Sequence, residues 1–411
     1  MAKGGQGSTL IAFRIRDFRL YWSGLAAQVA GQHMFQFTLG WLAFEITGSQ
    51  GKLAVIQLSA FVPQVALTLL GGALADRVDP RKLIQTAQSI AAAGVILVGA
   101  ITLLGRVELW HLACGAFLLG ISNAIDEPSR AAFFPRLLPK SHLRSGVPLI
   151  SMAFGGSRIV APSIAGFVIA AAGASATFLL SAIAISSMIA ILFLVRPGTG
   201  AAPSHGSLLD NFTESVRYIR ANEVFSKVIV AALLNAAFIM GYQHVLPVFA
   251  KDVLGVDSRG LGLLVTAIGT GALSGLLSYP WLQTRTTPRN AMVYALSGYC
   301  CALIGVAIST WFWVSFLLLV AVGLSQAYFM TSCQVILQTM VDDHYRGRVM
   351  GVFTLVWSLV YLSGFLLNFA GAWVGPQAAL AGGAAIVLSY VWLSLVRSPA
   401  LRALVLTPKV P

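Results

Sequence analysis

Charged residues are scarce in this sequence. Asp, Glu, Lys and Arg together account for 10% of the 411 residues, whereas hydrophobic residues account for 57% and the mean hydropathy is +0.81. Soluble domains carry about 25% charged residues, so the composition excludes an ordinary soluble protein. It predicts a chain that crosses a membrane many times.

The sequence also lacks the patterns that most enzymes and metal proteins need. No phosphate-binding loop of the Gly-x-x-x-x-Gly-Lys-[Ser/Thr] type occurs, and no nucleophile constellation is recognisable. The four cysteines lie inside apolar runs without metal-ligand spacing, which predicts buried packing residues and no disulfide: Cys114, Cys300, Cys301 and Cys333. We therefore expect no catalysis, no metal and no cofactor. The energy source must be a transmembrane gradient or a partner.

Apolar runs of spanning length predict twelve transmembrane helices, six in each half. The first six lie at about 18–46, 53–75, 82–105, 108–127, 146–171 and 174–195, and the second six at about 226–250, 259–283, 289–309, 311–338, 347–371 and 376–396. We expect an N-terminal six-helix bundle over 1–195, a cytoplasmic linker with an amphipathic helix over 196–225, and a C-terminal six-helix bundle over 226–411.

Basic residues outnumber acidic ones by 27 to 14. If the N-terminus is cytoplasmic, 22 of these 27 fall in inner segments and four in outer ones. This asymmetry is the bias of membrane proteins toward positive inner loops, and it explains the net charge without a nucleic acid partner. It predicts that both termini are cytoplasmic.

The two halves echo each other in sequence. Arg77-x-x-Pro80-Arg81 recurs as Arg285-x-x-Pro288-Arg289, and His142-x-Arg144-x-x-Val147 recurs as His344-x-Arg346-x-x-Val349. Both pairs fall at equivalent turns of the two halves, as a duplicated transporter repeat would place them.

The turn between the second and third predicted helices reads Gly72-x-Leu74-Ala75-Asp76-Arg77-x-x-x-Arg81-Lys82. With twelve helices in two halves, this motif resembles the major facilitator superfamily. The resemblance implies an all-α membrane protein of two pseudo-symmetric six-helix bundles that works by alternating access. It also implies a cytoplasmic gate that includes Gly72, Asp76, Arg77, Arg81 and Arg130. The alternative is that these arginines only hold the loop inside the cell.

A second resemblance lies in the fifth predicted helix, over 158–166. Pro162 and Gly166 match the Gly-Pro-x-x-Gly-Gly signature of the superfamily's drug/proton antiporters, whereas Ala161 and Ala165 stand where two of its glycines would be. This similarity implies a gating role for Pro162 and Gly166.

Further stretches are similar to the efflux branch that contains the bacterial enterobactin exporter. They are 39–42 with 45–49, Asp126-x-Pro128-x-Arg130, 247–255 and 346–350. This branch implies export but leaves the substrate open.

Asp126 and Arg130 are one helical turn apart near the inner membrane face, which favours a salt bridge in the gate. Pro128 between them is expected to kink or end the helix. Asp126 is also a candidate proton carrier, because a membrane carboxylate can be desolvated in one state and paired in another. Glu127 and His33 are the other candidates, and a hydrogen-bonded packing role is the alternative for His33.

Arg158 is the one basic residue deep in a predicted span. It must face a cavity, backbone carbonyls or a partner acid, because an unpaired buried guanidinium is costly. Two roles remain open: contact with a cavity, or a tether to Asp126 or Glu127.

The first predicted helix carries a polar stripe of Gln28, Gln32 and Gln36 at four-residue spacing, with His33 beside it. A polar stripe on a spanning helix is expected to face a cavity and not lipid. Since the first, fourth, seventh and tenth helices line the cavity in the superfamily, the candidate substrate-contacting residues are Gln32, His33, Gln36, Asn123, Arg158, Asn235, Tyr242, Gln326, Gln334 and Trp357.

These features together predict a monomeric, proton-coupled exporter of amphipathic small molecules, such as a drug-like compound or a siderophore, in the cytoplasmic membrane. Its partners are the substrate, protons and the lipid bilayer. Two alternatives stay open: an importer or facilitator on the same fold, and a non-transporting scaffold or receptor.

Overall fold

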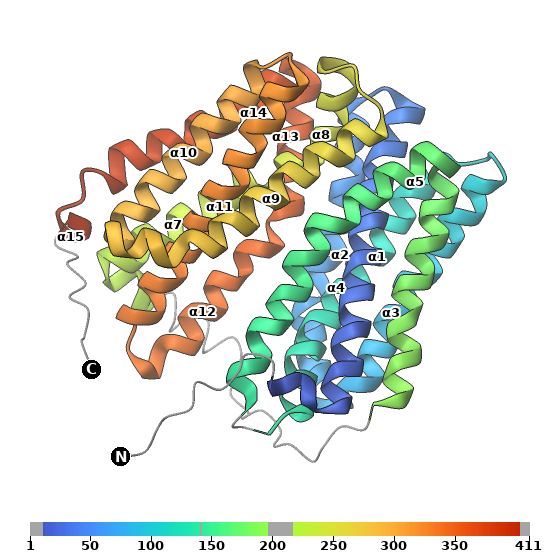
Figure 1. Cartoon of the computed structure of the whole chain (residues 1–411), viewed down its shortest axis with the longest axis horizontal. Helices are drawn as coiled ribbons and strands as arrows, with labels where there is room; N and C mark the ends of the chain where they lie inside the picture. Colours follow the sequence, from blue (N-terminus) through green and yellow to red (C-terminus); the bar gives the residue numbers. More distant parts are fainter. Residues whose placement is uncertain (1–10, 140–141, 196–216, 403–411) are drawn as a thin grey trace. The chain divides into compact units, whose positions relative to one another are not determined.

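The computed structural model describes residues 11–139, 142–195 and 217–402, and every regular element within them is helical (Figure 1). The chain divides into two compact units. Unit 1 contains α1, α2 from Leu58 onward, α3, α4 and α5, and unit 2 contains α7 to α15 together with residues 49–57.

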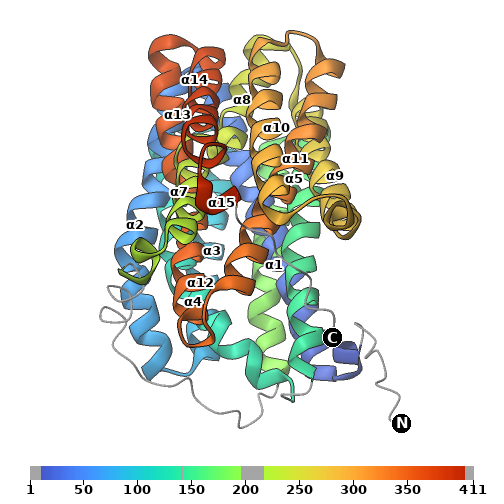
Figure 2. The ribbon, with the colours of Figure 1, turned by 90° about the vertical axis from the view of Figure 1, so that its left-hand side faces the viewer.

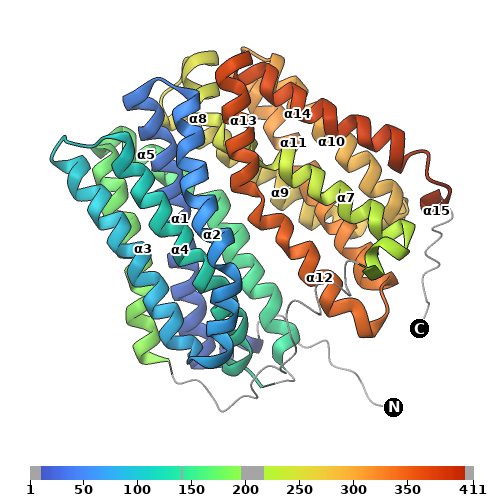
Figure 3. The ribbon, with the colours of Figure 1, turned by 180° about the vertical axis from the view of Figure 1, so that it is seen from behind.

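The helices of unit 1 are long and mostly apolar. Short 3₁₀ segments at Ile11–Arg14 and Phe134–Leu137 flank its helices, which are α1 (Arg16–Thr47), α2 (Gln50–Arg77), α3 (Pro80–Leu103), α4 (Leu109–Phe133) and α5 (Leu143–Leu194). Figure 3 shows α3 and α4 side by side, as their packing requires. Pro128 neither ends nor breaks α4, which continues to Phe133, so the expected termination there is wrong.

The 52-residue α5 contains two membrane spans. Gly173 interrupts it with φ 83° and ψ 171°, a backbone conformation that glycine adopts readily and other residues rarely do. Its two limbs correspond to the predicted spans at 146–171 and 174–195.

Unit 2 has the same number of spans but more interruptions. Its helices are α7 (Glu223–Phe238), α8 (Leu246–Val248), α9 (Ser258–Arg285), α10 (Pro288–Ile308), α11 (Phe312–Met340), α12 (Asp343–Ser358), α13 (Val360–Val374), α14 (Pro376–Tyr390) and α15 (Pro399–Arg402). A 3₁₀ segment, Met240–His244, and a π-helix, Phe249–Val253, break the seventh span on either side of α8. Figure 2 shows α13 and α14 running next to each other.

In the described part of the chain, nine helices are long and apolar enough to cross a membrane. One of them, Ser145–Leu194, is the double span of α5, and two predicted spans fall outside the nine: α1, which carries the polar stripe, and α12 with α13. When α5 is counted as two spans, and α1 and the α12–α13 pair are added, the helices give the twelve spans in two six-helix halves that the sequence predicts. The fold is all-α, as expected.

The two echoed turns have the same local structure. Asp79 caps α3 by accepting a hydrogen bond from the Arg81 backbone N–H at 3.1 Å, and Thr287 caps α10 by accepting one from the Asn290 N–H at 3.3 Å. In both helices a proline occupies the first helical position, where its missing N–H costs nothing. The repeat therefore preserves a helix start.

Glycine lets α2 approach α4 closely at Gly71. A Cβ added there would collide with the Ala124 carbonyl and contact Ile125. The close contact between α2 and α4 is thus at Gly71, one residue before Gly72, which is the glycine of the motif that resembles the superfamily.

We expect Gly71→Ala to lower the melting temperature of the purified protein, because the added methyl would separate two packed helices at a cost of about 1–3 kcal/mol. Gly156→Ala on α5 is the control, because no atom lies within 4 Å of a Cβ added there, and it should melt within about 0.5 kcal/mol of the wild type. Equal melting of the two variants would contradict the close packing at Gly71.

The cysteines are free, as predicted, but their environments differ. Cys300 and Cys333 are buried, Cys114 is partly buried, and Cys301 is exposed on the surface of α10. The prediction that all four are buried is therefore wrong for Cys301, which lies on a helix face that a lipid bilayer would cover.

Candidate functional site

The predicted gate loop joins the end of α2 to the start of α3. Arg77 is exposed in the last turn of α2, and Arg81 is partly buried in the first turn of α3. The side chain of Asp76 lies outside the described part of the structure, and Gly72 is partly buried. The loop's second acid, Asp79, has the helix-capping role described above.

The acid of α4 lies at the centre of a buried polar cluster. Asp126 Oδ2 accepts a hydrogen bond from Gln28 Nε2 at 3.0 Å and forms an ion pair with Arg130 Nε at 3.0 Å. The Asp126 and Gln28 side chains are fully buried, and the Arg130 side chain is 13% exposed. The predicted Asp126–Arg130 salt bridge is thus present, joined to α1 by Gln28.

This cluster leaves some of its polar atoms without a protein partner. Among the described residues, nothing hydrogen-bonds Asp126 Oδ1, Gln28 Oε1 or Arg130 Nη1, and all three atoms are buried. A buried ion pair is stable only while both charges are present, and removing one partner costs about 3–5 kcal/mol. Such a pair is well suited to respond to a change in charge.

Aromatic side chains surround the ion pair. The Arg130 guanidinium lies 4.9 Å from the centre of the Phe154 ring of α5, close enough for a cation–π interaction. The Tyr21 ring of α1 packs 5.5 Å from the Phe133 ring of α4, in a core shared with Ile84 of α3. The apolar surroundings keep the pair in a low dielectric.

Two long-range hydrogen bonds fix α5 against α1. Trp22 Nε1 donates to the Leu149 carbonyl at 2.7 Å, and the Ser157 hydroxyl donates to the Ala26 carbonyl at 3.1 Å. Arg158 directly follows Ser157 and therefore lies in the segment of α5 that these hydrogen bonds hold against α1.

The antiporter-like residues of α5 face the interior of unit 1. Pro162 and Gly166 are buried, and the alanines that replace two motif glycines, Ala161 and Ala165, pack against Met34 of α1. Glu127, the other acid of α4, is exposed.

The predicted cavity residues fall into two groups. Gln32, Asn235, Tyr242 and Gln326 are buried, whereas the remaining six are partly buried or exposed: His33, Gln36, Asn123, Arg158, Gln334 and Trp357. A side chain of the second group has surface available for a ligand.

Hydrogen bonds to the eleventh span stabilise the interruption in the seventh span. The Gly241 N–H donates to Ser363 Oγ at 2.9 Å, and Asn368 Nδ2 donates to the His244 carbonyl at 3.2 Å. A Cβ added to Gly241 would collide with the Gly364 backbone. These contacts satisfy backbone groups that the helix break leaves free, so the break is a defined structure.

Tyr242 lies in the 3₁₀ segment of this break, and Asn235 lies near the end of α7, just before it. The Tyr242 ring packs edge-on against Tyr299 of α10, 6.1 Å between centres, and Asn235 Nδ2 lies 4.0 Å from Met240 Sδ. Both side chains are fully covered in this structure.

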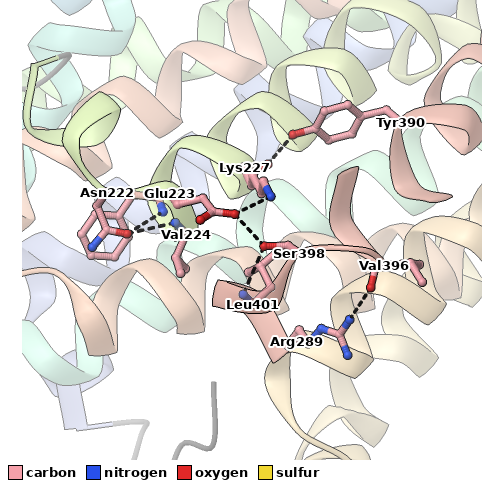
Figure 4. Close-up of polar contacts among 10 residues, drawn as sticks. Asn222, Glu223, Val224, Lys227, Arg289, Tyr390, Val396, Ser398 and Leu401 are labelled. Atoms are coloured by element: carbon pink, nitrogen blue, oxygen red, sulfur yellow. Dashed lines mark hydrogen bonds and ion pairs between the residues drawn. The ribbon is translucent and has the colours of Figure 1, made fainter. Parts of the chain in front are cut away.

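The end of unit 2 where α7 begins has a polar network of its own (Figure 4). Glu223 Oε1 accepts hydrogen bonds from Lys227 Nζ at 2.6 Å and from the Ser398 hydroxyl at 2.9 Å. Arg289, the echo of Arg81, donates from Nη2 to the Val396 carbonyl at 3.3 Å. In unit 2 the repeated arginine thus caps the last span and fixes the segment that follows it.

The described end of the predicted linker helix, residues 217–221, docks on the start of α12. The Tyr218 hydroxyl donates to Asp342 Oδ2 at 3.0 Å, and its ring stacks on Tyr345 with 4.2 Å between centres. Burial raises the pKa of Tyr218, so this phenol remains a neutral donor at physiological pH. The predicted linker over 196–216 lies outside the described residues.

Among the described residues, no group of three His, Cys, Asp or Glu side chains could hold a metal ion. In the described part of unit 1, the available chemistry includes that of the buried Asp126–Arg130 ion pair and its polar neighbours.

Comparison with known proteins places this arrangement in context. A family model described as transmembrane secretion effector, of the MFS group, matches residues 7–410. The multidrug efflux pump Tap of Mycobacterium tuberculosis is 28% identical over 399 residues, which cover 92% of this chain and 93% of the pump. The staphyloferrin A transporter of Staphylococcus aureus is 24% identical over 341 residues, 82% of this chain and 85% of that protein.

A solved structure has the same fold. The crystal structure of a bacterial homologue of the human lysosomal transporter Spinster, inward-facing and unoccupied, superposes with a TM-score of 0.75 at 14% identity, covering 94% of this chain and 97% of that one.

Proposed function

This chain belongs to the transmembrane secretion effector family of the major facilitator superfamily, and we propose that it exports amphipathic small molecules in exchange for protons. The observation that carries the proposal is the buried Asp126–Arg130 ion pair with Gln28 as its third member. A titratable pair inside a spanning helix is costly and is by default a functional site. The transmembrane proton gradient would supply the energy.

Asp126 is the residue that we assign to proton binding. Protonation of its carboxyl would remove the charge that holds Arg130 Nε and weaken the hydrogen bond from Gln28 Nε2. The guanidinium would then keep only its contact with the Phe154 ring. Proton binding would thereby loosen α4 from α1, and this is the change that we couple to alternating access of the two halves. Glu127 and His33 stay as alternative carriers.

The loop between α2 and α3 is the gate in this proposal. Arg77 and Arg81 lie at the same end of unit 1 as Arg130, and with Asp76, Gly72, Pro162 and Gly166 they form the set that we assign to gating. The enrichment of basic residues at this end supports a cytoplasmic position for it and for both termini, in the cytoplasmic membrane.

The proposed substrate class rests on the relatives and on the cavity candidates. One relative is named a multidrug efflux pump and another a staphyloferrin A transporter. The cavity candidates with exposed surface combine amides, an aromatic ring, an imidazole and a guanidinium, namely Gln36, Asn123, Gln334, Trp357, His33 and Arg158. Such a set would bind an amphipathic molecule through apolar contact and a few hydrogen bonds. We propose that the protein does so as a monomer.

Inverted membrane vesicles that contain the protein provide the test. When respiration acidifies their interior, they should accumulate ethidium, and a protonophore should abolish the accumulation. Vesicles without the protein are the control. Accumulation only in right-side-out vesicles would indicate import, and binding of ethidium without transport in either orientation would indicate a receptor or scaffold.

A further inference from the structure

Buried polar atoms without protein partners continue from Asp126 into the interior of unit 1. On α3, neither Nε2 nor Oε1 of Gln88 has a hydrogen-bond partner among the described residues, and the same holds for Ser122 Oγ on α4 and Gln32 Nε2 on α1. Gln88 and Ser122 are fully buried. Buried polar groups in folded proteins are nearly always hydrogen-bonded, so each of these atoms requires a partner that is not a protein group.

Helix packing places these residues on one level. A Cβ added to Gly94 of α3 would lie 3.2 Å from Leu118 Cβ of α4, so Gln88, six residues before Gly94, lies opposite the stretch from Ser122 to Asp126 in this antiparallel pair. Across α1 and α4, Gln28 is bonded to Asp126, and Gln32 and Ser122 each lie one turn further from that bond. Gln32, Ser122 and Gln88 therefore form a layer that lies within about 6 Å of the ion pair along the helix axes.

The mixture of hydrogen-bond donors and acceptors in this layer indicates which kind of molecule can fill it. The unsatisfied atoms include donors, such as Gln32 Nε2 and Arg130 Nη1, and acceptors, such as Asp126 Oδ1. A bound cation would satisfy only the acceptors and an anion only the donors. Water donates and accepts, and it typically fills buried sites that offer two to four polar partners.

The two ends of this series are its most accessible members. Gln32 keeps 8% of its surface exposed and the Arg130 side chain keeps 13%, whereas Gln28, Ser122, Gln88 and Asp126 between them are fully buried. On the far side of the layer, the edge-to-face rings of Phe35 and Phe178 close the interior. Gln32 and Arg130, at the two ends, are thus the members of the polar series that keep exposed surface.

We propose that a file of internal water molecules runs through unit 1 from Gln32 past Ser122 and Gln88 to Asp126 and Arg130, and that it carries protons to and from the Asp126 carboxyl. The inference rests on the proposed function, which assigns proton binding to Asp126. In each transfer every water of the file accepts one proton and releases one, so O–H bonds are exchanged along the file and the net change is the gain or loss of one proton at Asp126 Oδ1. The charged groups on the helices around this carboxyl are Arg130 and Glu127 on α4, and Arg81 and Lys82 in the first turn of α3.

The test replaces Gln88 by methionine, which has nearly the same shape and no strong hydrogen-bonding atom. We expect Gln88→Met to slow proton-driven ethidium uptake about tenfold while leaving ethidium counterflow, which needs no net proton movement, unchanged. Ser122→Ala removes a second member and should act in the same direction. An equal loss of uptake and counterflow would indicate a purely structural role and would overturn the proposal.

Gln64→Met is the matched control. Gln64 is also buried and has an unsatisfied Oε1, but it lies on α2, which packs against α4 at Gly120 and Ala124. Gly120 and Ala124 lie two residues before Ser122 and Asp126, respectively. Two residues turn about 200° around the helix axis, so α2 packs on the side of α4 opposite to Ser122 and Asp126. Uptake by Gln64→Met should equal that of the wild type, and a loss equal to that of Gln88→Met would contradict a path confined to α1, α3 and α4.

A readout without transport separates this inference from the proposed function. If wild-type protein shows no proton-driven uptake, the proposed function fails, and the melting temperature still tests the water file. Removing Gln88 from a hydrated layer should lower the melting temperature, because waters lose a partner. Removing it from a dry layer should raise it, since an unsatisfied amide is replaced by an apolar group of similar shape. A raised melting temperature would overturn the proposal.

Discussion

Replacing Asp126 by asparagine is expected to abolish proton-driven ethidium uptake, because the amide cannot take up and release a proton. It also leaves the Arg130 guanidinium buried without its counter-charge, which should destabilise the protein by up to about 3–5 kcal/mol. Uptake into inverted vesicles and the melting temperature of the purified variant measure the two effects. Uptake of the variant against a gradient would exclude Asp126 as the proton carrier.

A double variant separates the two effects of this substitution. Asp126→Asn with Arg130→Gln removes both charges, so the melting temperature should return toward that of the wild type, since replacing a whole buried pair is often nearly neutral. Proton-driven uptake should stay absent, because the titratable group is still missing. Recovery of uptake along with stability would show that Asp126 matters for folding alone.

Gly241→Ala is the second substitution with a large expected effect. Its methyl group would collide with the Gly364 backbone and disturb the hydrogen bond from the Gly241 N–H to Ser363 Oγ. We expect a loss of about 1–3 kcal/mol from overpacking, and more where the hydrogen bond is also lost. The measurement is the melting temperature together with the yield of folded protein in detergent.

The control for this substitution is Gly382→Ala on α14. No atom lies within 4 Å of a Cβ added there, and alanine is the better helix former, so this variant should be as stable as the wild type or more stable by up to about 1 kcal/mol. A Gly241→Ala protein that melts with the Gly382→Ala control would contradict the close packing of the broken span.

The twelve spans could be predicted because a bilayer requires about 20 apolar residues for each helix, a signal that is local in sequence. Breaks within spans could not, since they depend on partners. The seventh span is interrupted near Gly241, where Ser363 and Asn368 of another helix satisfy the backbone. Pro128 shows the reverse case, because it was expected to kink or end its helix and α4 continues through it to Phe133.

The ion pair of α4 could be predicted because its two residues are four apart on one helix. Its third member was harder to assign. Gln28 belongs to the polar stripe of α1, and only the packing of α1 on α4 shows that it bonds Asp126, 98 residues away. Gln88 and Ser122 carry no sequence signal that separates them from ordinary packing residues, although a buried glutamine inside an apolar helix such as α3 is itself unusual.

The repeat in the sequence could be recognised, but its roles could not be derived from it. Arg81 and Arg289 occupy equivalent places after a proline that begins a helix, and Arg289 caps the Val396 carbonyl. The cap depends on the path of the last span, which residues near 289 do not encode.

The measurement that tests the central claim most directly is the proton flux that accompanies substrate movement in proteoliposomes containing the purified protein and an internal pH indicator. Ethidium moving out of the lumen down its gradient should acidify the lumen in the wild type, and Asp126→Asn should show no acidification. Ethidium movement by the wild type without any change in lumenal pH would contradict proton exchange.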